Sequence, residues 1–586
     1  MIDPSRSSNS ADPRNPAARI PRCRTVLLAL VLLAMPAFQI YRYAVFASRQ
    51  GGIEHDSGWY FGTARNLAER GIYASSTNVA LSNEPIGRGT GCHNRPTVQD
   101  DEGFTYFPAG VTVGPGFIVP EALVLRLFGV GWWQYRLLPL SAMFCLLALL
   151  SALAYVRGGY GAVLLLQLWL WALPPLTFNF AYEAYSEHLA LLYSLLAVCA
   201  YGYAFAAERQ RALWVVAGLL LGLAYLTKSL FLISSAAVVL HVGWSIVGSS
   251  ATRKKACLGL ALIAAGFLLP VMAFEIYRFA VLVNRFGLHG YFANTADYML
   301  VFLSGGSGLG SDLQNRLEVA RVKLGILKTI GLKIAVLAWP LATGATVFAF
   351  RNPQAAKMSL RSRVVGTVLE VCAVKVMLVL TWFTFLTPSI FTRHAWDALI
   401  LIILLISIAL ATALRGLLPW RRRSLLAGLV LLLAVGNLTG FDYASTEVSP
   451  RLQYERVLRW YEPFYRPLQS LAFSPVFQRD AQQEVVNFLQ REVRDEDRIY
   501  YLGRFLVAEL PPLTGRVFFL MDRYEWDRRT RDGRAFVILG PYQIGDRPWR
   551  IPDEASIDRL LTRYEDKIVF QNECYVVIEG PVAGGD

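Results

Sequence analysis

The residues of this sequence that are best suited to chemistry are carboxylates and cations just outside long apolar runs. The stretch from Glu54 to Tyr73 reads EHDSGWYFGTARNLAERGIY, with Asp56 shortly after the first apolar run and Tyr60 on the apolar stripe of a helical pattern. A carboxylate in this position could accept a proton from an attacking hydroxyl group. It could also simply cap the helix that follows, because Asp is a favoured N-cap residue.

Other charged residues flank later apolar runs in the same way. Glu183 and Glu187 lie in FAYEAYSEHLAL, Lys228 lies in LGLAYLTKSLFLI, and Arg393 and His394 lie in FTRHAWD. Charged groups beside a membrane are costly unless they are paired or used, which makes them functional candidates. Each also has a structural explanation: Glu183 could be a solvated loop residue, Glu187 could cap a helix, Lys228 could reach the lipid headgroups, and Arg393 could anchor the interface.

The composition is typical of a polytopic membrane protein. The chain has 586 residues, of which 54% are hydrophobic and 17% are charged. The net charge of +14 does not require a nucleic-acid partner, because Lys and Arg gather in the short cytoplasmic loops of membrane proteins. The seven cysteines include no CxxC pair and no Cys/His cluster with metal-ligand spacing, which argues against a zinc module.

The apolar runs predict about eleven transmembrane helices, since a span needs about 20 residues. Residues 1–24 are predicted to form a disordered cytoplasmic tail. The two runs beside Lys228 could instead form one span, which would reduce the count to ten. The predicted spans are 25–47, 136–156, 160–179, 188–207, 212–228, 229–247, 257–283, 326–350, 364–387, 396–414 and 424–441.

Basic residues predict the orientation of these helices. Every alternate short loop is basic, which indicates a cytoplasmic N-terminus and, with eleven spans, a C-terminus outside. The charged residues described above then all face the outer side. The outer loops would be 48–135 and 284–325, and the second holds Arg285 and Arg321 against the charge rule and a glycine-rich stretch, SGGSGLG, that could act as a flexible lid.

The segment 442–586 is not membrane-like. Strand-like runs (RIYYLG, RVFFLM, AFVILG, KIVFQ and CYVVIEG) alternate there with helical patterns. This alternation predicts an extracytoplasmic α/β domain after a transmembrane module of residues 25–441. Cys92 and Cys574 would both lie in the oxidising compartment, where a disulfide between them is one alternative and two separate thiols are the other.

The order of these motifs resembles the GT-C superfamily of integral membrane glycosyltransferases, in particular the branch with the lipid A aminoarabinose transferase and the protein O-mannosyltransferases. The resemblance covers roughly residues 25–440. One departure is Ser57, which stands where relatives often carry a second carboxylate. The matching stretches are HDSGWYFGTARNLAERGIY, TYFPAGVTVGPGF, RLFGVGWWQYRLLPLSAMFCLLALLSALAY, AYEAYSEHLALLYSLLA, GLLLGLAYLTKSLFLI and FTRHAWDALILIILLI.

This resemblance implies a polyprenyl-phosphate sugar donor, a glycan, lipid or protein acceptor in the cell envelope, and a multi-pass location in the bacterial inner membrane. Asp56 would be the catalytic base, with Glu183 as second candidate, and the transfer would invert the anomeric centre. Because phosphate is a good leaving group, one base suffices and cations would stabilise the phosphate. A divalent metal ion on Asp56 and Glu183 stays open. The predicted phosphate-binding residues are Lys228, Arg393, Arg321 and Arg285, and the further site candidates are His55, Tyr60, Glu187 and His394.

Two other functions remain as alternatives to glycosyl transfer. A transporter or flippase of lipid-linked sugars would also need polar residues within a helical bundle, although such proteins often show internal repeats. A noncatalytic partner in envelope assembly would need no base. The sequence does not identify the sugar or the acceptor, because a few side chains on folded loops recognise both.

Overall fold

The computed structural model describes the following parts of the chain: residues 33–34, 36–41, 43–45, 52–53, 55–78, 98–108, 114–172, 177, 180–181, 184–206, 210–248, 250–301, 320–321, 360–386, 392–414, 424, 428, 479–502, 509–521, 534–540 and 561–580.

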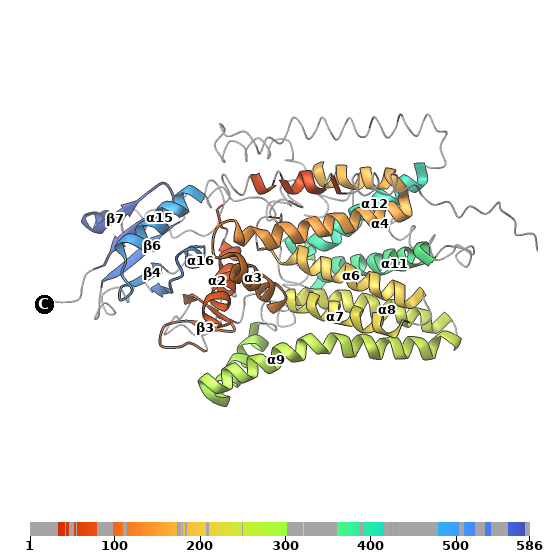
Figure 1. The fold of residues 1–586 in the computed structure, drawn as a ribbon, viewed down its shortest axis with the longest axis horizontal. Helices are drawn as coiled ribbons and strands as arrows, with labels where there is room; N and C mark the ends of the chain where they lie inside the picture. Colours follow the sequence, from red (N-terminus) through yellow and green to blue (C-terminus); the bar gives the residue numbers. More distant parts are fainter. Residues whose placement is uncertain are drawn as a thin grey trace, which may run out of the picture.

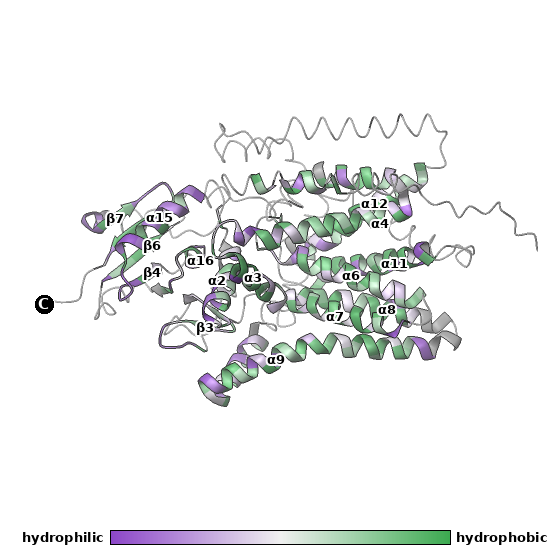
Figure 2. Ribbon diagram, in the orientation of Figure 1, coloured by the Kyte–Doolittle hydropathy of each residue, from purple (hydrophilic) through white to green (hydrophobic). Residues whose placement is uncertain are grey.

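Most of the described chain forms a bundle of long apolar helices that run side by side (Figure 1). Five helices hold stretches long and apolar enough to cross a membrane, and two shorter apolar helices lie among them. Figure 2 shows the apolar character along the bundle. The expected multi-pass helical membrane fold is thereby confirmed in outline. The bundle helices are α4 (Gln134–Ala172), α6 (Glu187–Ala206), α7 (Arg211–Thr227), α8 (Leu232–Gly248), α9 (Ser250–Val301), α11 (Leu360–Thr381) and α12 (Trp396–Leu414).

Two of these helices bend at a glycine. Helix α4 covers the predicted span 136–156 and the predicted span 160–179 as far as Ala172, and its two helical segments meet at a kink at Gly159, where φ is 68°. Helix α9 bends at Gly287, where φ is 71°, and continues to Val301. Glycine accepts this left-handed backbone without a side-chain clash. The first part of the predicted loop 284–325 is therefore helical.

The exact number of spans stays a prediction. The predicted span 326–350 lies outside the described residues, as does nearly all of 424–441, and the described pieces of 25–47 are helical and short. The SGGSGLG stretch also lies outside the described residues.

The segment after the first predicted span forms small elements at one end of the bundle. Helix α2 (His55–Arg70) is followed by strands β1 (Ala74–Ser75), β2 (Thr77–Asn78) and β3 (Thr105–Tyr106), and then by helix α3 (Pro115–Phe128). Strands β1 and β3 pair antiparallel. Asp56 lies in the first turn of α2 and Arg70 lies in its last turn. Both charges interact favourably with the helix dipole, which is positive at the N-terminus and negative at the C-terminus.

The carboxy-terminal region forms a mixed six-stranded sheet in the order β2-β5-β4-β6-β8-β7. Strands β4 (Arg498–Leu502), β5 (Phe518–Met521), β6 (Ala535–Leu539), β7 (Ile568–Gln571) and β8 (Val576–Glu579) lie where the alternating pattern predicts strands. The sixth strand is β2, which pairs parallel with β5 from the far end of the sequence. Helix α15 (Arg479–Glu492) packs on this sheet, and α2, α3 and α16 (Pro511–Thr514) lie between sheet and bundle (Figure 1).

Candidate active site

The start of α2 lies against the segment that leads into α6. Asp56 is half-buried in the first turn of α2. The next residue, Ser57, is fully buried, and its hydroxyl oxygen accepts a hydrogen bond from the backbone N–H of Ala184 at 3.0 Å. This bond holds Asp56 close to the polar residues at the beginning of α6.

Glu187 and Lys228 form a buried ion pair between two helix ends. Glu187 occupies the first turn of α6, where the helix dipole favours a negative charge. Lys228 follows the last residue of α7 in an extended conformation. Its ammonium group binds a carboxylate oxygen of Glu187, and the two residues are only 6% and 3% exposed. The ammonium group of this buried lysine therefore has a carboxylate directly beside it, as buried charges require.

A second buried pair lies next to the first. The ammonium of Lys375, on α11, is 2.9 Å from a carboxylate oxygen of Asp397 in the first turn of α12. It also lies 4.1 Å from the ring centroid of Phe231, whose N–H binds the carbonyl of Lys228. We call Glu187, Lys228, Lys375 and Asp397 the lysine–carboxylate cluster. Lys375 lies within a predicted span and was not among the predicted site residues, although a charge inside an apolar run is itself a signal.

Helix α3 packs directly on the end of α7 that carries Lys228. The N–H of Gly114 binds the carbonyl of Thr227 at 3.1 Å. A Cβ atom at Gly114 would lie 2.0 Å from the carbonyl oxygen of Leu226, and one at Gly116 would lie 2.3 Å from the hydroxyl oxygen of Thr227. Only glycine permits this approach, so the outer segment rests closely on the cluster.

These contacts bring together Asp56 and the lysines of the lysine–carboxylate cluster, a combination that suits the transfer of a group from an anionic leaving group to a hydroxyl. A half-buried carboxylate can take a proton, and buried lysines can stabilise an anionic leaving group. All of them lie at the end of the bundle that α2 and α3 cover. A substrate phosphate would reach the lysines only beside the carboxylates that already neutralise them.

The described contacts do not place Arg285 or Arg321 beside the lysine–carboxylate cluster. Arg285 pairs with Asp100 at 2.9 Å and lies 4.8 Å from the ring centroid of Tyr106. Burial is the main cause that raises the pKa of Tyr106, to about 12. Arg321 is exposed on a two-residue described piece. The assignment of both arginines to phosphate binding stays a prediction.

The remaining predicted site residues are described to different degrees. His55 and Arg393 lie in α2 and in the 3-10 turn η6 (Thr392–Ala395), and their side chains are outside the described part of the structure. His394 is half-buried, 6.4 Å from Trp382 between ring centroids. Tyr60 is buried and its ring meets Phe117 edge-on at 6.4 Å.

Glu183 lies outside the described residues, so the predicted metal pair of Asp56 and Glu183 stays a prediction. Within the described ranges, no group of three or more His, Cys, Asp or Glu side chains could hold a metal ion. Cys92 is also outside them, and Cys574 is buried, so their pairing is likewise untested.

A further polar cluster, which the sequence did not suggest, joins the two halves of α9 to the first outer segment. Arg278 donates to Glu275 at 2.8 Å and to Asn294 at 2.8 Å. The Asn294 amide in turn donates to the carbonyl of Phe107 at 3.0 Å, and Phe107 has a positive φ of 43°. This bond attaches the second half of α9 to the segment of residues 98–108 in the first outer segment.

Comparison with known proteins shows similarity in fold. No protein-family model matches the sequence, and a search of the curated proteins finds no match. The crystal structure of ArnT from Cupriavidus metallidurans bound to undecaprenyl phosphate is similar with a TM-score of 0.55 at 14% identity, over 96% of this chain and 99% of that chain. The same protein in the apo state gives 0.56 at 14% identity, over 96% of this chain and 100% of that chain. The GT-C-type fold implied by the sequence motifs is thereby confirmed.

Proposed function

The chain shares the fold of ArnT, a membrane glycosyltransferase of the GT-C type, and from this premise we propose that it is a glycosyltransferase itself. It moves a sugar from a polyprenyl-phosphate donor to a cell-envelope acceptor at the outer face of the membrane. The observation that carries the proposal is the position of Asp56, a half-buried carboxylate held by Ser57 against the segment that begins α6. A protein that only bound lipid would not need a base at this point.

In the proposed reaction, Asp56 accepts the proton of the acceptor hydroxyl group. The hydroxyl oxygen attacks the anomeric carbon of the donor, and the bond between that carbon and the phosphate oxygen breaks. Direct displacement inverts the anomeric centre, and the polyprenyl phosphate leaves with the bonding electron pair. Since phosphate leaves readily, no general acid is required.

Lys228 is the proposed stabiliser of the departing phosphate. It is buried at the end of α7, and Glu187 holds its ammonium group in place. Charge-assisted bonds to phosphate are stronger in a site that excludes water. Arg393 from η6, Arg285 just before the bend of α9, and Arg321 would supply further cations when donor is bound.

The proposed reaction also sets the orientation of the protein. The donor sugar and the envelope acceptor meet outside, so the end of the bundle with α2 and α3 faces the periplasm of a bacterial inner membrane. The N-terminus is then cytoplasmic and the carboxy-terminal sheet is extracytoplasmic.

The test is a transfer assay with the purified full chain in lipid nanodiscs. Radiolabelled polyprenyl-phosphate sugars are offered with envelope glycans, lipids and proteins, and covalent transfer of label is measured. The proposal predicts transfer by the wild type and at least about a hundredfold loss in Asp56→Asn, with normal folding and donor binding. Asp101→Asn, in an exposed turn of the same outer segment, is the matched control and keeps full activity.

Two results would contradict the proposal. Label that crosses a vesicle membrane without covalent transfer indicates a flippase. An Asp56→Asn enzyme with more than about a tenth of the wild-type rate shows that Asp56 is only a helix cap.

A further inference from the structure

Gly52 and Ile53, shortly before α2, are held by side chains from two different parts of the chain. The carbonyl of Gly52 accepts a hydrogen bond from the guanidinium of Arg136 at 2.8 Å. The N–H and the carbonyl of Ile53 both bind the side-chain amide of Gln482, each at 2.8 Å. Ile53 and Gln482 are fully buried, and Arg136 is 2% exposed. Three hydrogen bonds therefore fix the backbone just ahead of Asp56.

Gln482 is itself fixed within the carboxy-terminal sheet region. It lies in the first turn of α15, 429 residues after Ile53 in the sequence. The side chain of Gln482 is hydrogen-bonded to Tyr575. The hydroxyl group of Tyr575 donates to the buried carboxyl group of Glu509 at 2.9 Å. An amide that donates and accepts at one backbone residue copies the pairing of a β-strand, and it holds that residue in both position and rotation.

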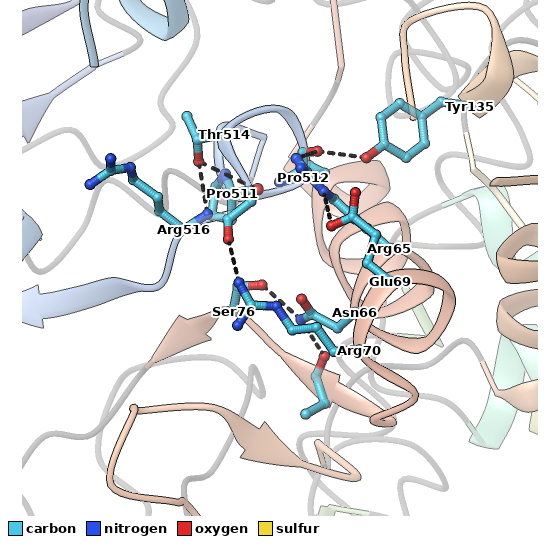
Figure 3. A network of polar contacts seen from close by, with 12 residues as sticks. Arg65, Asn66, Glu69, Arg70, Ser76, Tyr135, Pro511, Pro512, Thr514 and Arg516 are labelled. Carbon is cyan, nitrogen blue, oxygen red and sulfur yellow. Dashed lines mark hydrogen bonds and ion pairs between the residues drawn. The ribbon is translucent and has the colours of Figure 1, made fainter. Parts of the chain in front are cut away.

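The far half of α2 is held by the same region (Figure 3). Arg65 donates to the carbonyl of Pro512 at 2.8 Å, and Tyr135 donates to the same carbonyl at 2.5 Å. Arg70 reaches the carbonyl of Gly515 at 3.2 Å. Helix α2 is thus attached to the carboxy-terminal region at its entry through Gln482 of α15 and along its second half through the carbonyls of Pro512 and Gly515.

We infer that Gln482 is a positioning residue for Asp56, and that the carboxy-terminal region completes the active site through the backbone of Gly52 and Ile53. The inference rests on the proposed function, because it takes Asp56 as the base. The bond from Ala184 to Ser57 fixes α2 on the bundle side, and Gln482 fixes it on the sheet side. Loss of the bonds on either side of α2 would allow the Asp56 carboxylate to move away from the acceptor hydroxyl group.

The chain offers a matched control beside Gln482. Gln483 is the next residue of α15, and it also reaches across to the outer segment of the bundle. It accepts a hydrogen bond from the indole of Trp132 at 2.7 Å, at a point between α3 and α4 rather than ahead of α2. Methionine has nearly the length of glutamine and cannot make either amide bond. Gln482→Met and Gln483→Met therefore remove a similar contact between the same two regions.

The experiment measures both variants in the full chain in nanodiscs, by transfer kinetics and by hydrogen exchange of peptides covering residues 52–70. Gln482→Met is expected to lower kcat at least about tenfold with a donor KM within about twofold of the wild type, since a small displacement of a reacting group is costly. Amides of residues 55–60 should exchange at least about tenfold faster. Gln483→Met should change neither quantity.

The inference is overturned if Gln482→Met and Gln483→Met have the same kcat and the same exchange at residues 55–60. Gln482→Glu keeps the acceptor for the Ile53 N–H and loses the donor, so it should fall between wild type and Gln482→Met; it replaces that variant if the latter unfolds. If the wild type transfers no sugar, the proposed function fails, and the exchange rates alone decide whether Gln482 holds the segment.

Discussion

Lys228 and Lys375 are buried cations in an apolar bundle, and each has a carboxylate partner on a neighbouring helix. Isolated, either ammonium group would lose its hydration with no compensation. Paired, the two charges attract strongly in a low-dielectric surrounding, although the net gain over an apolar pair is small. Stability alone therefore does not explain these pairs, and for Lys228 the proposed role of the charge is to bind phosphate.

The pair of Lys375 and Asp397 allows a double-mutant test of this view. Lys375→Met or Asp397→Asn alone leaves one buried charge without its partner, so each should destabilise the protein by about 3–5 kcal/mol. The double variant should recover most of that loss. Thermal unfolding in detergent measures all three. Exposed Arg494 and Glu496, 3.8 Å apart, serve as the control pair whose removal changes little. Additive losses in the double variant would show that the two charges do not depend on each other.

The buried carboxyl group of Glu509, in the carboxy-terminal sheet region, should make the stability of the protein depend on pH. Burial raises the pKa of its carboxyl group from 4.5 to about 8. The unfolded chain releases this proton near pH 4.5 and the folded chain near pH 8, so the folded state binds the proton more tightly. The stability contributed by the protonated group is complete below about pH 4.5 and is lost as the pH rises to about 8.

Glu509→Gln should remove that dependence, because glutamine still accepts the Tyr575 hydrogen bond and does not titrate. The unfolding temperature of the wild type is measured from pH 5 to pH 9 beside that of the variant. The difference in stability between the two should shift toward the variant by up to about 1.4 kcal/mol per pH unit. A difference that stays constant across this range would show that Glu509 is already ionised in the folded protein.

At the scale of elements, the contact between α3 and α7 depends on two glycines. Gly116→Ala would put a methyl group 2.3 Å from the Thr227 hydroxyl oxygen and 2.7 Å from the Leu223 carbonyl oxygen. Relief of that clash moves α3 away from the end of α7, so the variant should lose about 1–3 kcal/mol and transfer more slowly. Gly243→Ala, on α8, has no atom within 4 Å of the new methyl group and is the control. Unfolding temperature and transfer rate are the readouts; equal values for the two variants would contradict the close packing.

The elements themselves were largely predictable, because the patterns behind them are local. Apolar runs identify α6, α7 and α12 nearly to their ends, and alternation identifies β4 to β8. The kink at Gly159 falls in the gap between the predicted spans 136–156 and 160–179. The helix that continues past Gly287 to Val301 was predicted as a loop instead. Lys375 was missed because its partner Asp397 is on another helix, and sequence spacing does not pair them.

At the scale of the whole molecule, the charge rule predicts one orientation, with the carboxy-terminus outside. A carboxy-terminal alkaline phosphatase fusion should be active in bacteria, and a carboxy-terminal fluorescent-protein fusion should be dark, because the phosphatase folds only outside. Fusions at residue 250, in the predicted inner loop after α8, should give the opposite pair of results. A bright carboxy-terminal fusion would put α2 and Asp56 in the cytoplasm and remove the basis of the proposed site.

The long-range assembly could not be predicted from the sequence. The alternating pattern of 442–586 suggested a separate domain, whereas the sheet takes its edge strand β2 from the first outer segment. A two-residue strand carries too little pattern to be recognised, and the pairing of Thr77 with Phe518 leaves no local trace. The same is true of Gln482 and Ile53. Candidate residues near the helix ends were identifiable; the side chains that position them were not.

The pairing of β2 with β5 also has a consequence for how the protein is made. About 440 residues separate these strands, and a ribosome adds about 5–20 residues per second, so β2 is synthesised roughly 20–90 s before its partner β5 exists. During most of that time the backbone N–H and carbonyl of Ile53 also lack their hydrogen-bond partner Gln482, which lies 429 residues later in the sequence. The edge strand of the sheet and the entry to α2 therefore take up their final positions only after almost the whole chain has been synthesised.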